Sequence, residues 1–236
     1  MNKLKLSKRL DTVARAIPAG ATAADIGSDH AYLPCYLCLE NRISKAVAGE
    51  VAEGPYHSAL SQVRKWNLTD RISVRKGDGL EVITPGEVDV VAIAGMGGKL
   101  IADILERGQS KLSGVSRLVI QPNVAGETVR LWFMTHGWRL RDETILEEDG
   151  KIYEVLVAER GDGHSPYRMA GEAGLRYGPF LMKEQNAAFR KKWRAEIAKW
   201  QRIEEQLAHA GETQEIMERK KRLRKKIDET EEILNG

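Results

Sequence analysis

Three acidic residues, Asp25, Glu50 and Asp78, each stand at the carboxyl end of a short run that is typical of a β-strand. A carboxylate accepts hydrogen bonds from ammonium and hydroxyl groups and repels a phosphate. The pattern therefore favours a ligand that carries ammonium or hydroxyl groups over one that binds mainly through phosphate.

The first of these acids opens the pattern Asp-x-Gly-x-Asp-x-Ala, which runs from Asp25 to Ala31. Gly27 permits a tight turn that a Cβ atom would obstruct. Tyr32 and Leu33 begin an apolar helical spacing, and free backbone N–H groups converge where a helix begins. The pattern indicates a ligand-binding loop, although a plain strand-to-helix turn has the same form.

Glu50 follows Gly27 by roughly twenty residues, at the end of the second predicted strand. In dinucleotide-binding folds an acid at this place accepts hydrogen bonds from ribose hydroxyls. The alternative is a surface acid that opens a helix, but two acids at matching strand ends favour the ribose interpretation. Further along, Gly95 begins the run Gly-Met-Gly-Gly, which indicates close approach of the backbone to a ligand or simply a sharp turn.

The elements that would position these residues alternate between strand and helix. Because strand–helix alternation is typical of a parallel sheet, we expect an α/β, doubly wound, mostly parallel seven-stranded sheet. An Asp-Gly turn at Asp149 predicts that the last two strands form an antiparallel hairpin. Ligands of such sheets bind outside the carboxyl ends of the strands. The predicted strands are 19–24, 45–49, 71–75, 88–94, 117–120, 138–145 and 151–159.

The composition is that of an ordinary globular protein of 236 residues, with a formal net charge of +3. No apolar run reaches the roughly 20 residues of a membrane span, and no signal-peptide core is present, so we expect a cytoplasmic protein. Cys35 and Cys38 stand in a C-x-x-C spacing that suits either a redox pair or a reduced structural pair. Without a second pair we expect no zinc and no other metal.

Both ends of the chain carry basic residues on amphipathic helices. Near the N-terminus, Arg9 lies either on a solvated face or against a carboxylate or phosphate of a ligand. We predict a catalytic domain over 1–160, a connector over 161–179 and an antiparallel, coiled-coil-like helical hairpin over 180–236, with a break between its two helices at Gly211. Its basic residues are either solvated or bind RNA phosphates; they include Lys191, Lys192, Arg194 and the run 219–226.

Three motifs in combination resemble one family. The residues Asp25 to Pro34, the Ala-Gly-Met-Gly-Gly run and the Gln-Pro-Asn run are similar to those of bacterial tRNA adenine-N1 methyltransferases that modify tRNA position 22. The N-terminal helix and the C-terminal hairpin also look like that family. The resemblance implies a Rossmann-like class I methyltransferase that uses S-adenosylmethionine, binds tRNA and forms 1-methyladenosine. A monomer is the expectation for its oligomeric state.

The resemblance also implies how the cofactor is bound. Gly27 and the Ser28–His30 backbone would hold the methionine part of S-adenosylmethionine, and Asp25 would lie near its ammonium group or a water molecule ordered by that group. Glu50 would accept the ribose hydroxyls. By the same resemblance, Asp78 and Gly79 would contact the edge of the adenine. Ala94 and Gly95 would line the side of methyl transfer.

The acceptor side departs from the general methyltransferase pattern. Asp29 and Ala31 replace later glycines of the first loop, and the fourth strand lacks the Asn/Asp-Pro-Pro-Tyr of many base-amine methyltransferases. This suits a ring nitrogen as acceptor. A carboxylate would stabilise the positive charge that develops on the base. Asp29 is the candidate, although it could only cap the next helix, and Gln121 and Asn123 would orient the base or form a helix start.

Three other functions compete with this interpretation. A methyltransferase could act on another RNA base. A nicotinamide-dependent oxidoreductase would need a full Gly-x-Gly-x-x-Gly, which the first loop lacks. A non-catalytic RNA-binding protein with a degenerate nucleotide pocket would explain the basic hairpin but not three acids at strand ends.

Overall fold

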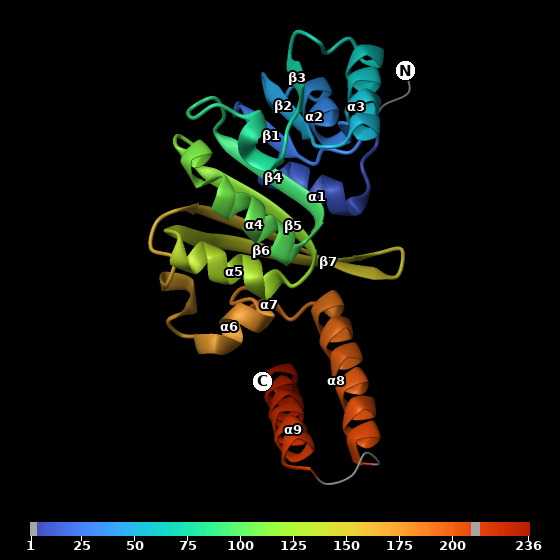
Figure 1. The fold of residues 1–236 in the computed structure, drawn as a ribbon, viewed down its shortest axis with the longest axis vertical. Helices are drawn as coiled ribbons and strands as arrows, with labels where there is room; N and C mark the ends of the chain where they lie inside the picture. The colour runs from blue at the N-terminus through green and yellow to red at the C-terminus, as the bar shows by residue number, and fades with distance from the viewer. Residues whose placement is uncertain (1–3, 209–212) are drawn as a thin grey trace.

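One mixed sheet organises the protein, whose computed structural model describes residues 4–208 and 213–236 (Figure 1). Its strand order is β3-β2-β1-β4-β5-β7-β6. Strands β1 to β5 are parallel, β7 runs antiparallel to β5, and β6 runs antiparallel to β7. The bounds are β1 Ala23–Ile26, β2 Ala46–Glu50, β3 Ile72–Lys76, β4 Val90–Gly97, β5 Arg117–Val124, β6 Trp138–Glu148 and β7 Lys151–Arg160.

The order of the strands creates a crevice between β1 and β4. The chain builds outward from β1 through β2 to β3, then returns to place β4 on the other side of β1. The connections on either side of β1 therefore leave in opposite directions, and ligands of open α/β sheets bind at such a reversal.

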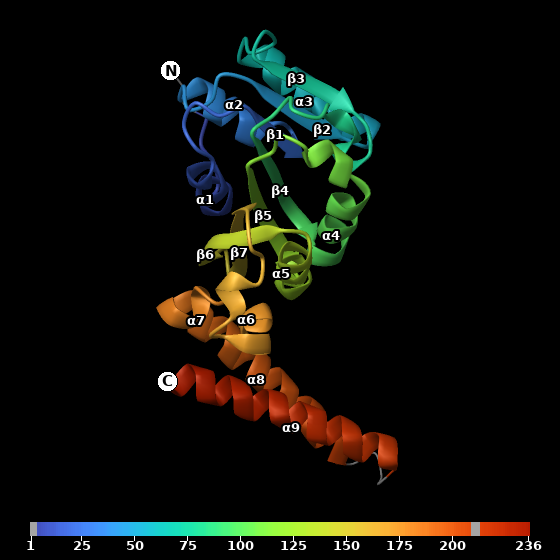
Figure 2. The same cartoon turned by 90° about the vertical axis from the view of Figure 1, so that its left-hand side faces the viewer.

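Helices cover both faces of the sheet (Figure 2). One core packs α1 (Lys8–Ala16), α2 (Tyr32–Leu39) and α3 (Glu53–Lys65) on one face. The other core packs α4 (Gly98–Arg107) and α5 (Gly126–Thr135) on the opposite face. Alternate residues of β4 enter the two cores, as they must in a strand that is buried on both sides. The doubly wound prediction is confirmed.

Several strands begin or end at other residues than the sequence predicts. β1 begins at Ala23 rather than Ala19, since only residues from Ala23 onward pair with both β2 and β4. β4 and β5 run past the predicted ends, and their pairing continues through a register shift to Gly97 and Val124. The glycine run after Ala94 is therefore partly strand, not wholly a turn.

The predicted connector is folded. It contains a 3₁₀ turn, η3 (Ser165–Tyr167), and the helix α6 (Gly171–Tyr177), followed by the short helix α7 (Leu181–Glu184). Tyr167 and Tyr177 are both buried. These segments lie beyond the β6 edge of the sheet and lead into the C-terminal helices (Figure 1).

Two long helices, α8 (Ala187–Ala208) and α9 (Gln214–Asn235), run antiparallel and form what we call the C-terminal hairpin. Arg190 Nη1 at the start of α8 donates to Leu234 O at the end of α9, at 2.9 Å. A third core, which includes Phe189 and Trp193, packs them together against Ile145 of β6. The helical pair is as predicted, whereas the predicted break at Gly211 lies outside the described residues. No helix in the described ranges is long and apolar enough to cross a membrane.

Candidate active site

A cavity of about 720 Å³ opens at the carboxyl ends of the parallel strands. The start of α1 and Tyr153 of β7 complete its wall. A smaller cavity of about 260 Å³ at the opposite end of the strands does not include the predicted site residues. Among the predicted residues, the larger cavity is lined by Arg9, Asp25, Gly27, Ser28, Asp29, Glu50, Ala94, Gly95 and Asn123.

Asp25 is a buried carboxyl group in the cavity wall. Its residue is 6% exposed, and Ser28 Oγ donates a hydrogen bond to Asp25 Oδ2 at 2.5 Å. Burial raises the pKa of Asp25 to about 7, the Ser28 hydrogen bond opposes that shift, and the nearby Glu50 adds to it. This carboxyl group therefore titrates near neutral pH and would ionise more readily beside a ligand cation.

The loop after β1 is held in a left-handed conformation. Gly27 has a φ of +68°, and the three successive residues Asp29, His30 and Ala31 have φ values of 36°, 63° and 53°. Such angles are uncommon outside glycine and persist only where the surroundings impose them. Here the Asp29 N–H donates to Glu50 Oε1, so the loop is tied to the end of β2. The loop is thus preorganised beside the cavity.

Glu50 has the burial expected of a ligand-binding acid, with 5% of the residue exposed. Burial raises its pKa, and the hydrogen bond from the Asp29 N–H opposes that shift. A carboxylate accepts several hydrogen bonds. Glu50 can therefore hold the loop and still accept a hydroxyl group of a ligand.

Gln121 is fully buried and fixes the Gly95 peptide group from behind the cavity wall. Its Oε1 accepts from the Gly95 N–H at 3.0 Å and from Arg9 Nη1 at 2.6 Å. Its Nε2 donates to Asn123 Oδ1 at 3.2 Å, and Asn123 Nδ2 donates to Gly95 O at 2.7 Å. The backbone N–H and the backbone C=O of Gly95 are thus both held by side-chain amides of β5. Gln121 positions this part of the wall, while Asn123 itself lines the cavity.

Arg9 enters the cavity because the tip of the β6–β7 hairpin holds the N-terminus of α1. Glu148 accepts hydrogen bonds from the backbone N–H groups of Lys8 and Arg9, at 2.6 and 3.1 Å, and the Ser7 side chain caps the helix. The Arg9 guanidinium lies 5.5 Å from the centre of the Tyr153 ring. Glu148 and Tyr153 were missed from sequence because they follow Arg9 by about 140 residues.

Several predicted residues do not line the cavity. The Asp78 carboxylate pairs with Arg107 at 2.5 Å, and Gly79 begins the 3₁₀ turn η1 (Gly79–Val82). The side chain of His30 lies near Asp29, with His30 Nε2 and Asp29 Oδ1 3.6 Å apart.

Asp29, which does line the cavity, does not cap α2. The N-cap residue of that helix is Ala31, and no side chain caps it.

The basic residues of α8 differ in their surroundings. Lys191 pairs with Glu147 at 2.5 Å, and Lys192 pairs with the buried Glu154 at 2.5 Å. Arg194 is exposed. The ion pair gives Lys192 a structural partner, and an ammonium group bound to a buried carboxylate is less available to a phosphate. The RNA contacts expected of these α8 residues stay predictions.

The two cysteines are free thiols buried in the core of the α2 face. Burial raises the pKa of Cys35 to about 12 and raises that of Cys38 as well. A reactive thiol needs a lowered pKa and access to solvent. Of the two alternatives, the geometry favours the reduced structural pair. In residues 4–208 and 213–236, no group of three or more potential metal ligands gathers.

The strand order and a cavity over the ends of β1, β2 and β4, with acids at the ends of β1 and β2, define a class I S-adenosylmethionine-dependent methyltransferase. A family model described as tRNA (adenine(22)-N(1))-methyltransferase, TrmK, matches residues 23–232. The chain belongs to this family. This membership confirms the predicted family, fold and enzyme class.

Known relatives resemble the chain over its whole length. A curated tRNA (adenine(22)-N(1))-methyltransferase of Bacillus subtilis (strain 168) is 52% identical over 100% of this chain and 99% of its own. The crystal structure of the B. subtilis M1A22 tRNA methyltransferase TrmK has a TM-score of 0.93 at 52% identity, covering 98% of this chain and 99% of that one. A Streptococcus pneumoniae protein in complex with S-adenosyl-L-methionine has a TM-score of 0.81 at 42% identity, covering 98% and 100%.

Proposed function

We propose that the protein transfers the methyl group of S-adenosylmethionine to N1 of adenine 22 in tRNA, and that the cavity of about 720 Å³ is where transfer occurs. The observation that carries this assignment is the buried pair Asp25 and Glu50 at adjacent strand ends, in a chain of this family. These acids suit the ammonium and ribose hydroxyl groups of the cofactor.

The residues present fit the cofactor. Asp25 would bind the ammonium group, Glu50 would accept a ribose hydroxyl, and the left-handed loop from Gly27 would hold the methionine chain. A Cβ atom at Gly27 would overlap the Met96 methyl group, and its φ of +68° strains any other residue, so this turn beside the cavity requires glycine. Because Asp78 lies outside the cavity, we place the adenine of the cofactor against the wall beyond Glu50, formed by Val51 and Ala52.

The cofactor supplies an electrophilic methyl group, and the protein has mainly to orient the acceptor. Adenine N1 already has a lone pair, so alignment beside Gly95 supplies much of the acceleration. Positive charge then develops on the base, shared between N1 and the exocyclic amine, and the Asp29 carboxylate would stabilise it. Arg9, held by Gln121, would bind a phosphate of the target nucleotide. The base must leave its stack to reach the cavity.

The direct test is methylation of a tRNA transcript by the purified protein, followed by mapping of the modified base. We expect one 1-methyladenosine at position 22 and none in a transcript that carries guanine there. Modification of another base would refute the assigned target. In thermal melting, S-adenosylmethionine should stabilise the protein and NAD should not. The reverse ranking would indicate an oxidoreductase.

The pH dependence of cofactor binding should report Asp25. Its pKa in the free protein is about 7, and an ammonium group favours the ionised form, so binding releases a proton below that pH. Cofactor affinity should therefore rise with pH up to about 7 and level off above it. Asp25→Asn should weaken binding at pH 8 by about 10- to 100-fold.

Calorimetric titration at several pH values measures both effects. The amino group of the ligand titrates in both proteins, so the difference between wild type and variant isolates Asp25. The raised pKa also means that the free protein loses stability as pH rises from the ordinary pKa of an aspartate towards 7, because Asp25 gives up its proton more readily in the unfolded chain. The asparagine variant should lose this pH dependence of unfolding. Equal affinity of both proteins at pH 8 would contradict the assignment.

The C-terminal hairpin is our proposed tRNA-binding element, through exposed basic residues of α9. Lys221, Arg222 and Lys225 are exposed on that helix. Changing all three to glutamine should raise the KM for tRNA. It should also make the slope of log K against log salt shallower by about 0.9 for each phosphate that the variant no longer neutralises. Filter binding at several salt concentrations measures the slope.

A matched control removes three exposed charges at the other end of the molecule, on and near α3. The triple variant Lys45→Gln, Arg64→Gln, Lys65→Gln has the same net charge change. It should bind tRNA nearly as well as wild type. Equally weakened binding in both triple variants would mean that only net charge matters, and that α9 does not bind the tRNA.

A further inference from the structure

The two faces of the β6–β7 hairpin serve different parts of the protein. Tyr153 pairs in register with Leu146, on the face that meets α1 and the cavity. The next residue of β7, Glu154, pairs with Ile145 on the other face, where Ile145 and Ile152 pack against the C-terminal helices. Adjacent residues of a strand point to opposite faces. A shift of β7 would therefore move the cavity wall and the hairpin contact together.

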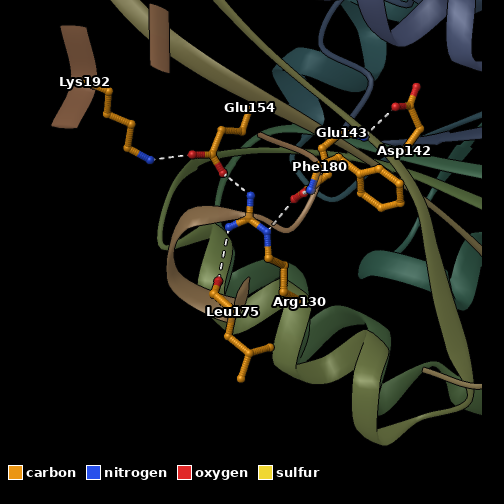
Figure 3. A network of polar contacts seen from close by, with 7 residues as sticks. All are labelled: Arg130, Asp142, Glu143, Glu154, Leu175, Phe180 and Lys192. Atoms are coloured by element: carbon orange, nitrogen blue, oxygen red, sulfur yellow. Dashed lines mark hydrogen bonds and ion pairs between the residues drawn. The ribbon is translucent and has the colours of Figure 1, made fainter. Parts of the chain in front are cut away.

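A buried ion network occupies the second of these faces (Figure 3). Arg130 of α5, whose side chain is 1% exposed, donates from Nε to Glu143 at 2.6 Å and from Nη2 to Glu154 at 2.7 Å. Its Nη1 donates to Leu175 O of α6 at 3.3 Å. Glu154 uses its other oxygen to accept from Lys192 Nζ of α8, at 2.5 Å.

The backbone between α6 and α7 closes around the same network. The Phe180 N–H donates to Glu143 Oε2 at 3.1 Å. Gly178 has a φ of +87°, and a Cβ atom there would come within 2.7 to 2.8 Å of the Glu143 carboxylate and the Arg130 guanidinium. Helices α5, α6 and α8 and strands β6 and β7 thus converge on two carboxylates and two cations.

The network joins five elements of the fold, and desolvation of its buried charges offsets much of their attraction. Removal of one partner would leave the others buried without a counter-charge. Lys192 is the member that belongs to the C-terminal hairpin. Its ammonium group also lies over the Trp193 ring, with Nζ 4.7 Å from the ring centre, so Glu154 and the ring both hold it in place.

We propose that Lys192 and Glu154 are positioning residues for tRNA methylation. Their ion pair fixes the C-terminal hairpin against β7, so that tRNA bound along the hairpin reaches the cavity wall at Tyr153 at the same time. Simultaneous binding at two sites makes the second binding event effectively intramolecular, and this advantage disappears if the geometry forbids it. This inference rests on the proposed function of the hairpin as the tRNA-binding element.

The test is a double-mutant cycle read out on tRNA and on the cofactor separately. Lys192→Met and Glu154→Gln should each raise the KM and the dissociation constant for tRNA by about tenfold or more, because misplacement of a remote element is costly. The double variant should be no worse than either single one. Lys192→Arg keeps the charge and should stay close to wild type. The affinity for S-adenosylmethionine should not change in any of them.

The cycle separates this role from a direct phosphate contact. If Lys192 bound RNA, Glu154→Gln would free it and tighten tRNA binding, which would overturn the proposal. Unchanged tRNA binding in both single variants would do the same. Lys65→Met is the control for the loss of one exposed lysine, and melting curves ensure that all variants are folded at the assay temperature.

Failure of the proposed function gives a different result. A wild-type protein that bound tRNA without methylating it would refute the activity, and the cycle of dissociation constants would still decide the role of Lys192 and Glu154. If the triple variant at Lys221, Arg222 and Lys225 bound tRNA as tightly as wild type, the hairpin would not be the tRNA-binding element. The inference about Lys192 and Glu154 would then be refuted with it.

Discussion

Asp29→Asn is expected to lower the turnover of tRNA methylation by about 10²- to 10³-fold while leaving the affinity for S-adenosylmethionine nearly unchanged. The Asp29 side chain lines the cavity and is 81% exposed, and it does not cap α2. It is therefore available to the substrate. Its contact with Glu50 is made by the backbone N–H, which Asp29→Asn keeps.

Asparagine is the sharper substitution because of the local backbone. Asp29 has a φ of 36°, a region that asparagine and aspartate tolerate better than alanine does. Asp29→Asn thus removes the charge and keeps the loop, whereas Asp29→Ala would lose turnover and also strain the loop. Asp70→Asn, on an exposed turn before β3, is the matched control. Single-turnover rates at saturating tRNA measure the effect, and wild-type rates in Asp29→Asn would exclude the carboxylate role.

The sheet and the cofactor side of the site could be predicted because their signals are local. A strand ends where its apolar pattern ends, so Asp25 and Glu50 could be placed at one edge of the sheet before their contacts were known. Gly27 could be placed in the turn from its residue type alone, because glycine readily adopts the positive φ that a tight turn needs. Its φ in the structure is +68°. Parallel strands then bring their carboxyl ends together whatever the details of packing.

The acceptor side could not be predicted because its contacts join distant parts of the chain. Gln121 had the polar side chain of a substrate ligand, yet it is buried, and its partner Arg9 is 112 residues away. Gln121 pairs with Ala94 just before the register shift through which β4 and β5 extend. Glu148 and Tyr153 reach the cavity only because the β6–β7 hairpin folds back to α1. No local pattern contains that information.

Lys192 shows a second limit. A dense run of basic residues predicts either a solvated face or a nucleic-acid contact, and both interpretations assume exposure. Its partner Glu154 lies on β7, within a run of apolar residues that predicts only a buried strand. Composition could not distinguish a lysine that binds RNA from one that holds two parts of the protein together.

Arg130→Met is expected to lower the free energy of unfolding by about 3–5 kcal/mol, the largest stability effect that we predict, because it leaves two buried carboxylates without their shared partner. Glu143 and Glu154 are 4% and 5% exposed. Arg168→Met, which breaks an exposed pair with Asp162, should cost less than about 1 kcal/mol. Urea denaturation of the two variants and wild type measures both values, and a loss of similar size in each would mean that burial of the network has no energetic role.

The pH dependence of the unfolding free energy of Arg130→Met tests whether unpaired charge is the cause of the destabilisation. Burial raises the pKa of Glu143, and Arg130 opposes that shift; burial alone would also raise the pKa of Glu154, but Arg130 and Lys192 hold it below its usual range. Without Arg130 both pKa values should rise in the folded state. A carboxyl group with a raised folded-state pKa lowers the free energy of unfolding progressively as pH rises from its unfolded-state pKa to its folded-state pKa, because the unfolded chain loses the proton first. The loss is complete above the folded-state pKa and disappears at low pH, where the group is protonated in both states. The difference in free energy of unfolding between wild type and Arg130→Met should therefore be largest at pH 8 and become smaller towards pH 5. Adding Glu143→Gln and Glu154→Gln to the variant should remove most of this pH dependence. A gap that is constant with pH would show that poorer packing, rather than unpaired charge, accounts for the destabilisation.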